Sequence, residues 1–163
     1  MPDLSATISS DFSGYYEYVA KQVHKWVDPL SQEQFWRNPF SYGNSVGHLM
    51  LHLTGNLSYY IGAQIAETGY IRNRDLEFTE KRKLPKEEVL QAFDRTIGMV
   101  VETLRKQSPE DWMAPYSAER ETDAKDRLTI FLRCAGHAYH HVGQIIFLSK
   151  ELAKEAGPRT ASA

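Results

Sequence analysis

Apolar residues recur every three or four positions in four stretches of the chain, which is the spacing of one face of an α-helix. The stretches cover residues 8–27, 46–65, 85–104 and 127–152. Asp28-Pro29 ends the first stretch, Gly69 follows the second, and Asn44 or Ser45 can cap the start of the second. No stretch alternates as a strand would. The pattern therefore predicts an all-α protein with four helices.

Short turns and polar segments separate these helices. Ser31 followed by Gln34 is typical of a capping box, and Ser108-Pro109 is typical of a cap followed by a first-turn proline. Segments 70–84 and 115–126 are polar and lack helical periodicity, so we expect loops there. Four helices with two longer crossings predict a four-helix bundle. We expect a single domain over residues 1–157, followed by a C-terminal tail over 158–163.

The last predicted helix is apolar over much of its surface. Its main apolar face includes Phe131 and Ile145, and a second stripe beside it includes Ile130 and Leu148. Burial on more than one side of a helix is expected when a bundle core is combined with a dimer contact. The outward residues that we expect at this contact are Phe147, Tyr139 and His140.

Composition narrows the classes of partner. The chain has 19 Lys and Arg against 21 Asp and Glu, a formal charge of −2, and no basic block, which argues against binding to nucleic acid. No run of about 18 apolar residues predicts a membrane span, and the N-terminus does not resemble an export signal. The single cysteine, Cys134, suits a reducing compartment. We therefore expect a soluble cytoplasmic protein.

Five of the six histidines fall in two groups, His48 with His52 and His137 with His140 and His141. Two histidines four positions apart lie one helical turn from each other, so their rings can reach one ion. Adjacent histidines diverge by about 100° on a helix and do not usually share an ion.

The helical wheel selects one set of ligands. His137 and His141 belong to the second apolar stripe, whereas His140 projects away from it; His52 borders the apolar face, and His48 lies nearer to solvent. We therefore predict that His52, His137 and His141 bind a metal ion and that His48 and His140 do not. Three imidazoles leave coordination positions open, as in catalytic sites. A structural role for histidines in the bundle core is the alternative.

Two motifs carry a resemblance to a known family. The segments NSVGHLMLHLTGN at 44–56 and GHAYHHVGQI at 136–145 resemble the two histidine motifs of the DinB-like family, and the similarity covers nearly the whole chain. The resemblance implies an up-down-down-up four-helix bundle, often a homodimer. It also implies a divalent metal ion such as zinc or nickel at His52, His137 and His141, with Gly143 and Gln144 after the last ligand.

The same resemblance implies a range of chemistry. Some relatives are thiol-dependent transferases or isomerases that use a low-molecular-weight thiol such as mycothiol or bacillithiol. We therefore expect a metal-dependent transferase, isomerase or hydrolase in which the ion lowers the pKa of a water or thiol and presents the anion to a small electrophile. The alternatives are a non-enzymatic dimer that binds a metal or small ligand, and a bundle that has kept the histidines without the metal.

Three further residues lie near the predicted ligands. Gln144 is placed to orient a molecule at the metal or to form a hydrogen bond inside the bundle, and Asn56, one turn beyond His52, is either a supporting residue or an ordinary polar one. Cys134, one turn before His137, either approaches the metal or acts as a small buried apolar residue, which is the commoner role of a lone cysteine. The sequence contains no recognisable Ser-His-Asp set or phosphate-binding glycine loop, so it assigns no catalytic side chain.

Overall fold

The structure, a computed structural model, describes residues 3–155, so the predicted tail over 158–163 lies outside the described part. Within residues 3–155 every regular element is helical, and β structure is limited to two isolated bridges. The elements are α1 (Leu4–Val27), α2 (Gln32–Trp36), α3 (Val46–Leu57), the π-helix η1 (Ser58–Ala63), α4 (Arg74–Thr79), α5 (Lys86–Arg105), α6 (Pro109–Trp112) and α7 (Arg127–Glu155).

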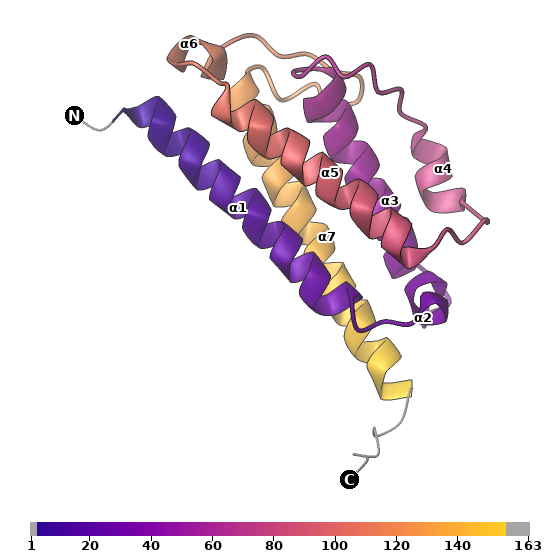
Figure 1. Cartoon of the computed structure of the whole chain (residues 1–163). Helices are drawn as coiled ribbons and strands as arrows, with labels where there is room; N and C mark the ends of the chain where they lie inside the picture. Colours follow the sequence, from indigo (N-terminus) through magenta and orange to yellow (C-terminus); the bar gives the residue numbers. More distant parts are fainter. Residues whose placement is uncertain (1–2, 156–163) are drawn as a thin grey trace.

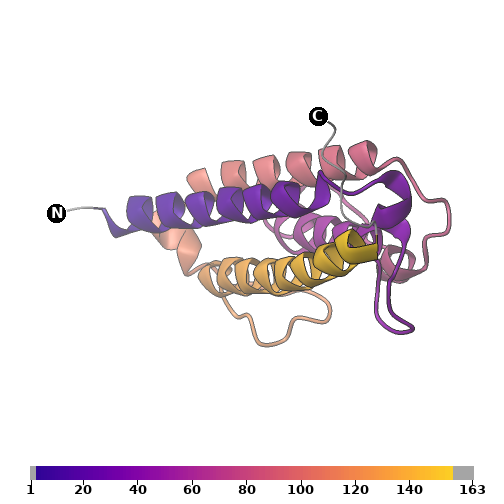
Figure 2. The ribbon, with the colours of Figure 1, turned by 90° about the horizontal axis from the view of Figure 1, so that it is seen from below.

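The four long helices α1, α3, α5 and α7 form the body of the molecule (Figures 1 and 2). Helix α1 packs against α5 and α7, and α3 packs against the same two helices. The short helix α4 packs against α3, outside the four long helices. This arrangement is compatible with the predicted helical bundle. None of the helices over residues 3–155 is long and apolar enough to cross a membrane.

The core follows the predicted apolar faces. All four long helices contribute fully buried side chains, among them Tyr16, Met50, Phe93 and Phe131. The hydroxyl of Tyr16 donates a hydrogen bond to the Phe131 carbonyl at 2.8 Å, so the one polar group of this buried ring is satisfied. Apolar burial joins α1 to α7 at this point, and it holds α3 and α7 in place for the site described below.

Helix starts agree well with the predicted caps. The Ser31–Gln34 capping box is present at α2, and Ser108 forms a capping box with Asp111 at α6. Ser45, rather than Asn44, caps α3 by accepting a hydrogen bond from the His48 amide. The first and last helices are longer than predicted, because α1 begins at Leu4 and α7 continues to Glu155.

Two predictions about the middle of the chain were wrong. The second predicted helix does not continue as an α-helix toward Gly69, because a π-helix replaces it from Ser58 to Ala63. A π turn adds only about one residue to each turn, so apolar spacing does not reveal it. Segment 70–84 is not all loop: it contains α4, which Asn73 caps and whose first turn carries Asp75 and Glu77. One short turn is too brief to show periodicity.

Candidate metal centre

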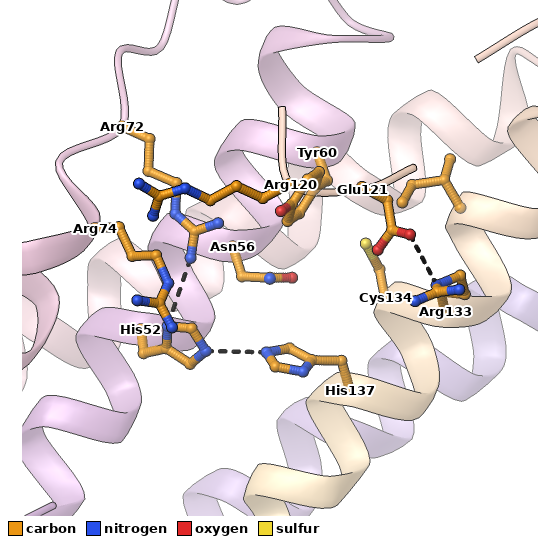
Figure 3. Close-up of a pocket in the computed structure, with 11 residues that line it drawn as sticks. His52, Asn56, Tyr60, Arg72, Arg74, Arg120, Glu121, Arg133, Cys134 and His137 are labelled. Atoms are coloured by element: carbon orange, nitrogen blue, oxygen red, sulfur yellow. Dashed lines mark hydrogen bonds and ion pairs between the residues drawn. The ribbon is translucent and has the colours of Figure 1, made fainter. Parts of the chain in front are cut away.

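Three histidines from two helices converge on one point. His52 lies on α3, and His137 and His141 lie on α7; one ring nitrogen from each lies within 4.8 Å of the other two. The Nε2 atoms of His52 and His137 are 3.0 Å apart (Figure 3). His52 is buried and His137 is partly buried. The three residues that helical spacing selected are therefore close enough to hold a metal ion.

A buried carboxylate holds the ring of His52. The Nδ1 atom of His52 lies 2.7 Å from Oε2 of Glu77, whose side chain is only 6% exposed. Since a carboxylate accepts a hydrogen bond, Nδ1 carries the proton and the lone pair of Nε2 faces His137. Such a carboxylate–histidine pair fixes the tautomer and orientation of a metal-binding imidazole.

Arg72 supports this carboxylate in turn. Its Nε and Nη2 atoms donate to the two oxygens of Glu77 at 2.7 and 2.9 Å, and Nη2 also lies 3.5 Å from Nδ1 of His52 (Figure 3). Burial alone would raise the pKa of Glu77, but the hydrogen bonds from His52 and Arg72 lower it below its ordinary value. Glu77 is therefore an anion whose charge Arg72 neutralises and to which His52 donates a further hydrogen bond.

Sequence reasoning missed Glu77, although two signals bear on it. It lies in the first turn of α4, where an acidic residue is favoured by the helix dipole. Across from it, Gly55 of α3 leaves room for the carboxylate, because a Cβ atom at Gly55 would clash with the Glu77 side chain. Neither signal identifies a partner of His52 without the three-dimensional structure.

His141 has a hydrogen-bond partner of its own. Its Nδ1 atom lies 2.7 Å from Oε1 of Gln144, so Nδ1 donates and Nε2 keeps its lone pair. Burial, together with the neighbouring histidines, lowers the pKa of His137 to about 3, and burial likewise lowers that of His141 to about 4. Both rings are therefore neutral near pH 7, which is the form that binds a metal ion.

The two remaining members of the histidine groups lie apart from this point. His48 is bonded through Nδ1 to the Ser45 hydroxyl at 2.8 Å and through Nε2 to the Glu80 carbonyl at 3.1 Å. His140 is exposed beside His141. Neither His48 nor His140 belongs to the cluster of ring nitrogens.

The two other candidates near the ligands differ in what they contact. Asn56 is 7% exposed, and its Oδ1 atom has no hydrogen-bond partner; Glu77, not Asn56, holds His52. Cys134 is buried, as expected of a small apolar residue, and burial raises the pKa of its thiol to about 12. Cys134 therefore stays a thiol at neutral pH.

A cavity of about 360 Å³ adjoins His52 and His137. Asn56, Tyr60 and Cys134 line it together with several arginines (Figure 3). The donor set suits a divalent transition metal ion, because imidazole is a ligand of zinc, nickel, copper and iron. Three imidazole ligands leave positions free for a further molecule, and the cavity has room for one beside them.

Comparison with known proteins gives one match. The model of the family described as "Protein of unknown function (DUF1572)" matches residues 5–158, a range that includes all three clustered histidines. No curated protein and no solved structure matches the chain. Because the family model covers nearly the whole sequence, the chain belongs to the DUF1572 family.

Proposed function

We propose that this protein is a metal-dependent enzyme of the DinB-like class, in which a low-molecular-weight thiol attacks a small electrophile. The ion would be Zn²⁺ or Ni²⁺, held by His52, His137 and His141. The observation that carries the proposal is the convergence of three ring nitrogens within 4.8 Å beside a cavity large enough for a small molecule. The orientation of His52 by a buried carboxylate supports it.

The proposal includes the up-down-down-up order of the DinB-like bundle. In Figure 1, α1 and α7 descend toward the lower right, whereas α3 and α5 rise in the opposite sense. This order requires one connection that runs back along the bundle, because α3 and α5 point the same way, and the segment that carries α4 provides it. The directions of the helices therefore support the family resemblance.

The side chains of the site have distinct roles in this proposal. Glu77 keeps the proton of His52 on Nδ1, and Gln144 does the same for His141, so both rings would present Nε2 to the ion. When bound, a divalent ion would supply Lewis acidity that favours the thiolate form of a thiol. Cys134 is the only cysteine of the chain, and its high pKa makes it a poor nucleophile. The reactive thiol would therefore come from a separate molecule.

Metal analysis and a chelator test examine this function. Protein purified without a His tag is expected to contain about one transition metal ion per chain. In a screen of small thiols with small electrophiles, turnover should stop on addition of a chelator and return when the metal is restored. Turnover that persists in the chelator would contradict the proposal. Metal binding without any turnover would instead favour the non-enzymatic binding protein.

We also propose that the protein is a cytoplasmic homodimer. Phe147 of α7 is 55% exposed and stacks on Phe40, and Tyr139 forms an exposed aromatic cluster with Tyr15 and Tyr18. Exposed aromatic side chains are enriched at protein interfaces. The reducing cytoplasm would keep a thiol cosubstrate reduced.

A charged residue in place of Phe147 tests the proposed dimer. Light scattering should return twice the chain mass of 18.7 kDa, and Phe147→Glu should shift the mass toward the monomer, because a buried unpaired charge is costly. Met113→Glu is a control, since Met113 is a similarly exposed apolar residue that follows α6 and lies outside α7. A wild-type monomer at micromolar concentration would contradict the dimer.

A further inference from the structure

Arginines surround the cavity beside the histidines. They come from distant parts of the sequence and meet at its walls: Arg72 just before α4, Arg74 at the start of α4, Arg120 in the segment before α7, and Arg133 in α7 (Figure 3). Among the described residues that line this cavity, one is acidic, Glu121. The lining therefore carries an excess of positive charge, although the chain as a whole has a formal charge of −2.

Two of these arginines are already paired with carboxylates. Arg72 donates to Glu77, as described above. The Nε atom of Arg133 lies 3.2 Å from Glu121, and its Nη1 atom lies 3.6 Å from Asp123. These pairs offset the charges of Arg72 and Arg133, so the unbalanced charge comes from the other two arginines.

Arg74 and Arg120 lack strong partners. Within residues 3–155 Arg74 forms no ion pair; its guanidinium lies over the ring of Phe78, 5.2 Å from the ring centre. The nearest carboxylate oxygen to Arg120 is that of Glu119, at 3.7 Å from Nε, and both side chains are exposed. An exposed pair at this distance contributes little. Both guanidinium groups are therefore available to a ligand.

The same two arginines mark the junction of two cavities. A second cavity, of about 610 Å³, shares Tyr60, Arg72, Arg74 and Arg120 with the first and opens beside Tyr59 and Tyr70. Arg120 adopts a φ angle of +66°, a left-handed conformation that is rare for a residue with a side chain. Such conformations cluster at functional sites.

Asn56 supplies an independent sign of a ligand. Its side chain is more than nine-tenths buried, its Oδ1 atom has no hydrogen-bond partner, and Figure 3 shows it pointing into the space between the His52–His137 pair and Arg120. A buried polar atom without a partner is costly in a folded protein. Because Oδ1 accepts hydrogen bonds, a molecule in the cavity that carries an N–H or O–H group would give this atom a partner.

We propose that this cavity binds a small molecule bearing a carboxylate or phosphate group, with Arg74 and Arg120 donating to the oxyanion and Asn56 Oδ1 accepting from an N–H or O–H group nearer to the histidines. The planar guanidinium group donates two parallel hydrogen bonds to an oxyanion, which is why arginine suits both classes of anion. The claim that the reactive end of this molecule points toward the histidines rests on the proposed function. Binding of its anionic group by Arg74 and Arg120 does not depend on that function.

Calorimetric titration of chelator-treated protein tests the proposal without requiring activity. The probes are succinate, inorganic phosphate and succinamide, the uncharged diamide of succinate. At least one of the two anions should bind, and succinamide should not. The anion that binds more tightly identifies the class of ligand, carboxylate or phosphate. Arg74→Gln and Arg120→Gln should each weaken binding of that anion at least about tenfold, which is about 1.4 kcal/mol, because each removes a charge-assisted hydrogen bond to the oxyanion.

Arg95→Gln is the matched control, since Arg95 is an exposed arginine of α5 that does not line either of these cavities. This variant should bind the anion as the wild type does, and added salt should weaken binding to the wild type. Three results would each overturn the proposal: no binding of either anion, equal binding of succinamide, or an equal loss in Arg95→Gln. Anion binding by a protein that shows no chelator-sensitive turnover would leave this inference standing and refute only the proposed function.

Discussion

Replacing His137 by alanine is expected to abolish tight metal binding. The Nε2 atom of His137 lies 3.0 Å from that of His52, so the substitution removes one of three clustered donors and leaves two. Loss of a supporting partner alone typically costs 10–100-fold in metal affinity, so loss of a ligand should exceed about 100-fold. Competition with a chromophoric chelator measures the affinity, and elemental analysis measures the metal that is retained.

His140→Ala is the control for this experiment. His140 precedes His141 on the same helix, is exposed, and lies outside the cluster of ring nitrogens. Its removal should leave the metal stoichiometry and affinity unchanged, whereas His52→Ala and His141→Ala should behave like His137→Ala. Equal loss of metal in the His140 variant would show that the ligands are wrongly assigned.

Glu77→Gln is expected to weaken both the metal site and the fold. The amide cannot neutralise Arg72, whose side chain is 9% exposed, and it supports His52 less well than a carboxylate does. Breaking a buried ion pair from one side costs about 3–5 kcal/mol. Because glutamine keeps some hydrogen bonds, we expect a loss near the lower end of this range and a 10–100-fold loss of metal affinity. Urea denaturation of the metal-free protein measures the loss of stability separately from the loss of metal affinity.

Asp75→Asn isolates the special role of Glu77. Asp75 lies in the same first turn of α4 and is exposed, so its loss removes only a favourable interaction with the helix dipole, about 0.3–1 kcal/mol. The metal affinity of this variant should equal that of the wild type. If Glu77→Gln and Asp75→Asn have the same small effect, Glu77 does not position His52.

The main helices and the histidine cluster could be predicted from the sequence because both depend on local spacing. Apolar residues three or four positions apart define the faces of the long helices, and the same spacing places His137 and His141 one turn apart. The wheel also indicated that His52, not His48, faces α7. These inferences need only the geometry of single helices and the fact that apolar faces meet in a core.

The partners of the cluster could not be predicted in this way. Glu77 is 25 positions from His52 and lies in a segment rich in charged residues, where a buried carboxylate has the same sequence pattern as a solvated one. Arg72, Arg74 and Arg120 also come together only through the path of the crossing segments. Sequence spacing ranks residues within one helix, whereas these contacts join segments whose relative positions depend on the whole fold.

The contact between Glu77 and His52 makes the crossing from α3 to α5 part of the site. One carboxylate both holds the ring of His52 and, through Arg72 and the space above Gly55, fixes the segment that carries α4. By thermodynamic linkage, the free energy by which an ordered crossing would favour ion binding equals the free energy by which a bound ion would favour the ordered crossing. We therefore expect that an ion at the histidines would also stabilise the crossing, and with it the walls that Arg72 and Arg74 give the cavity.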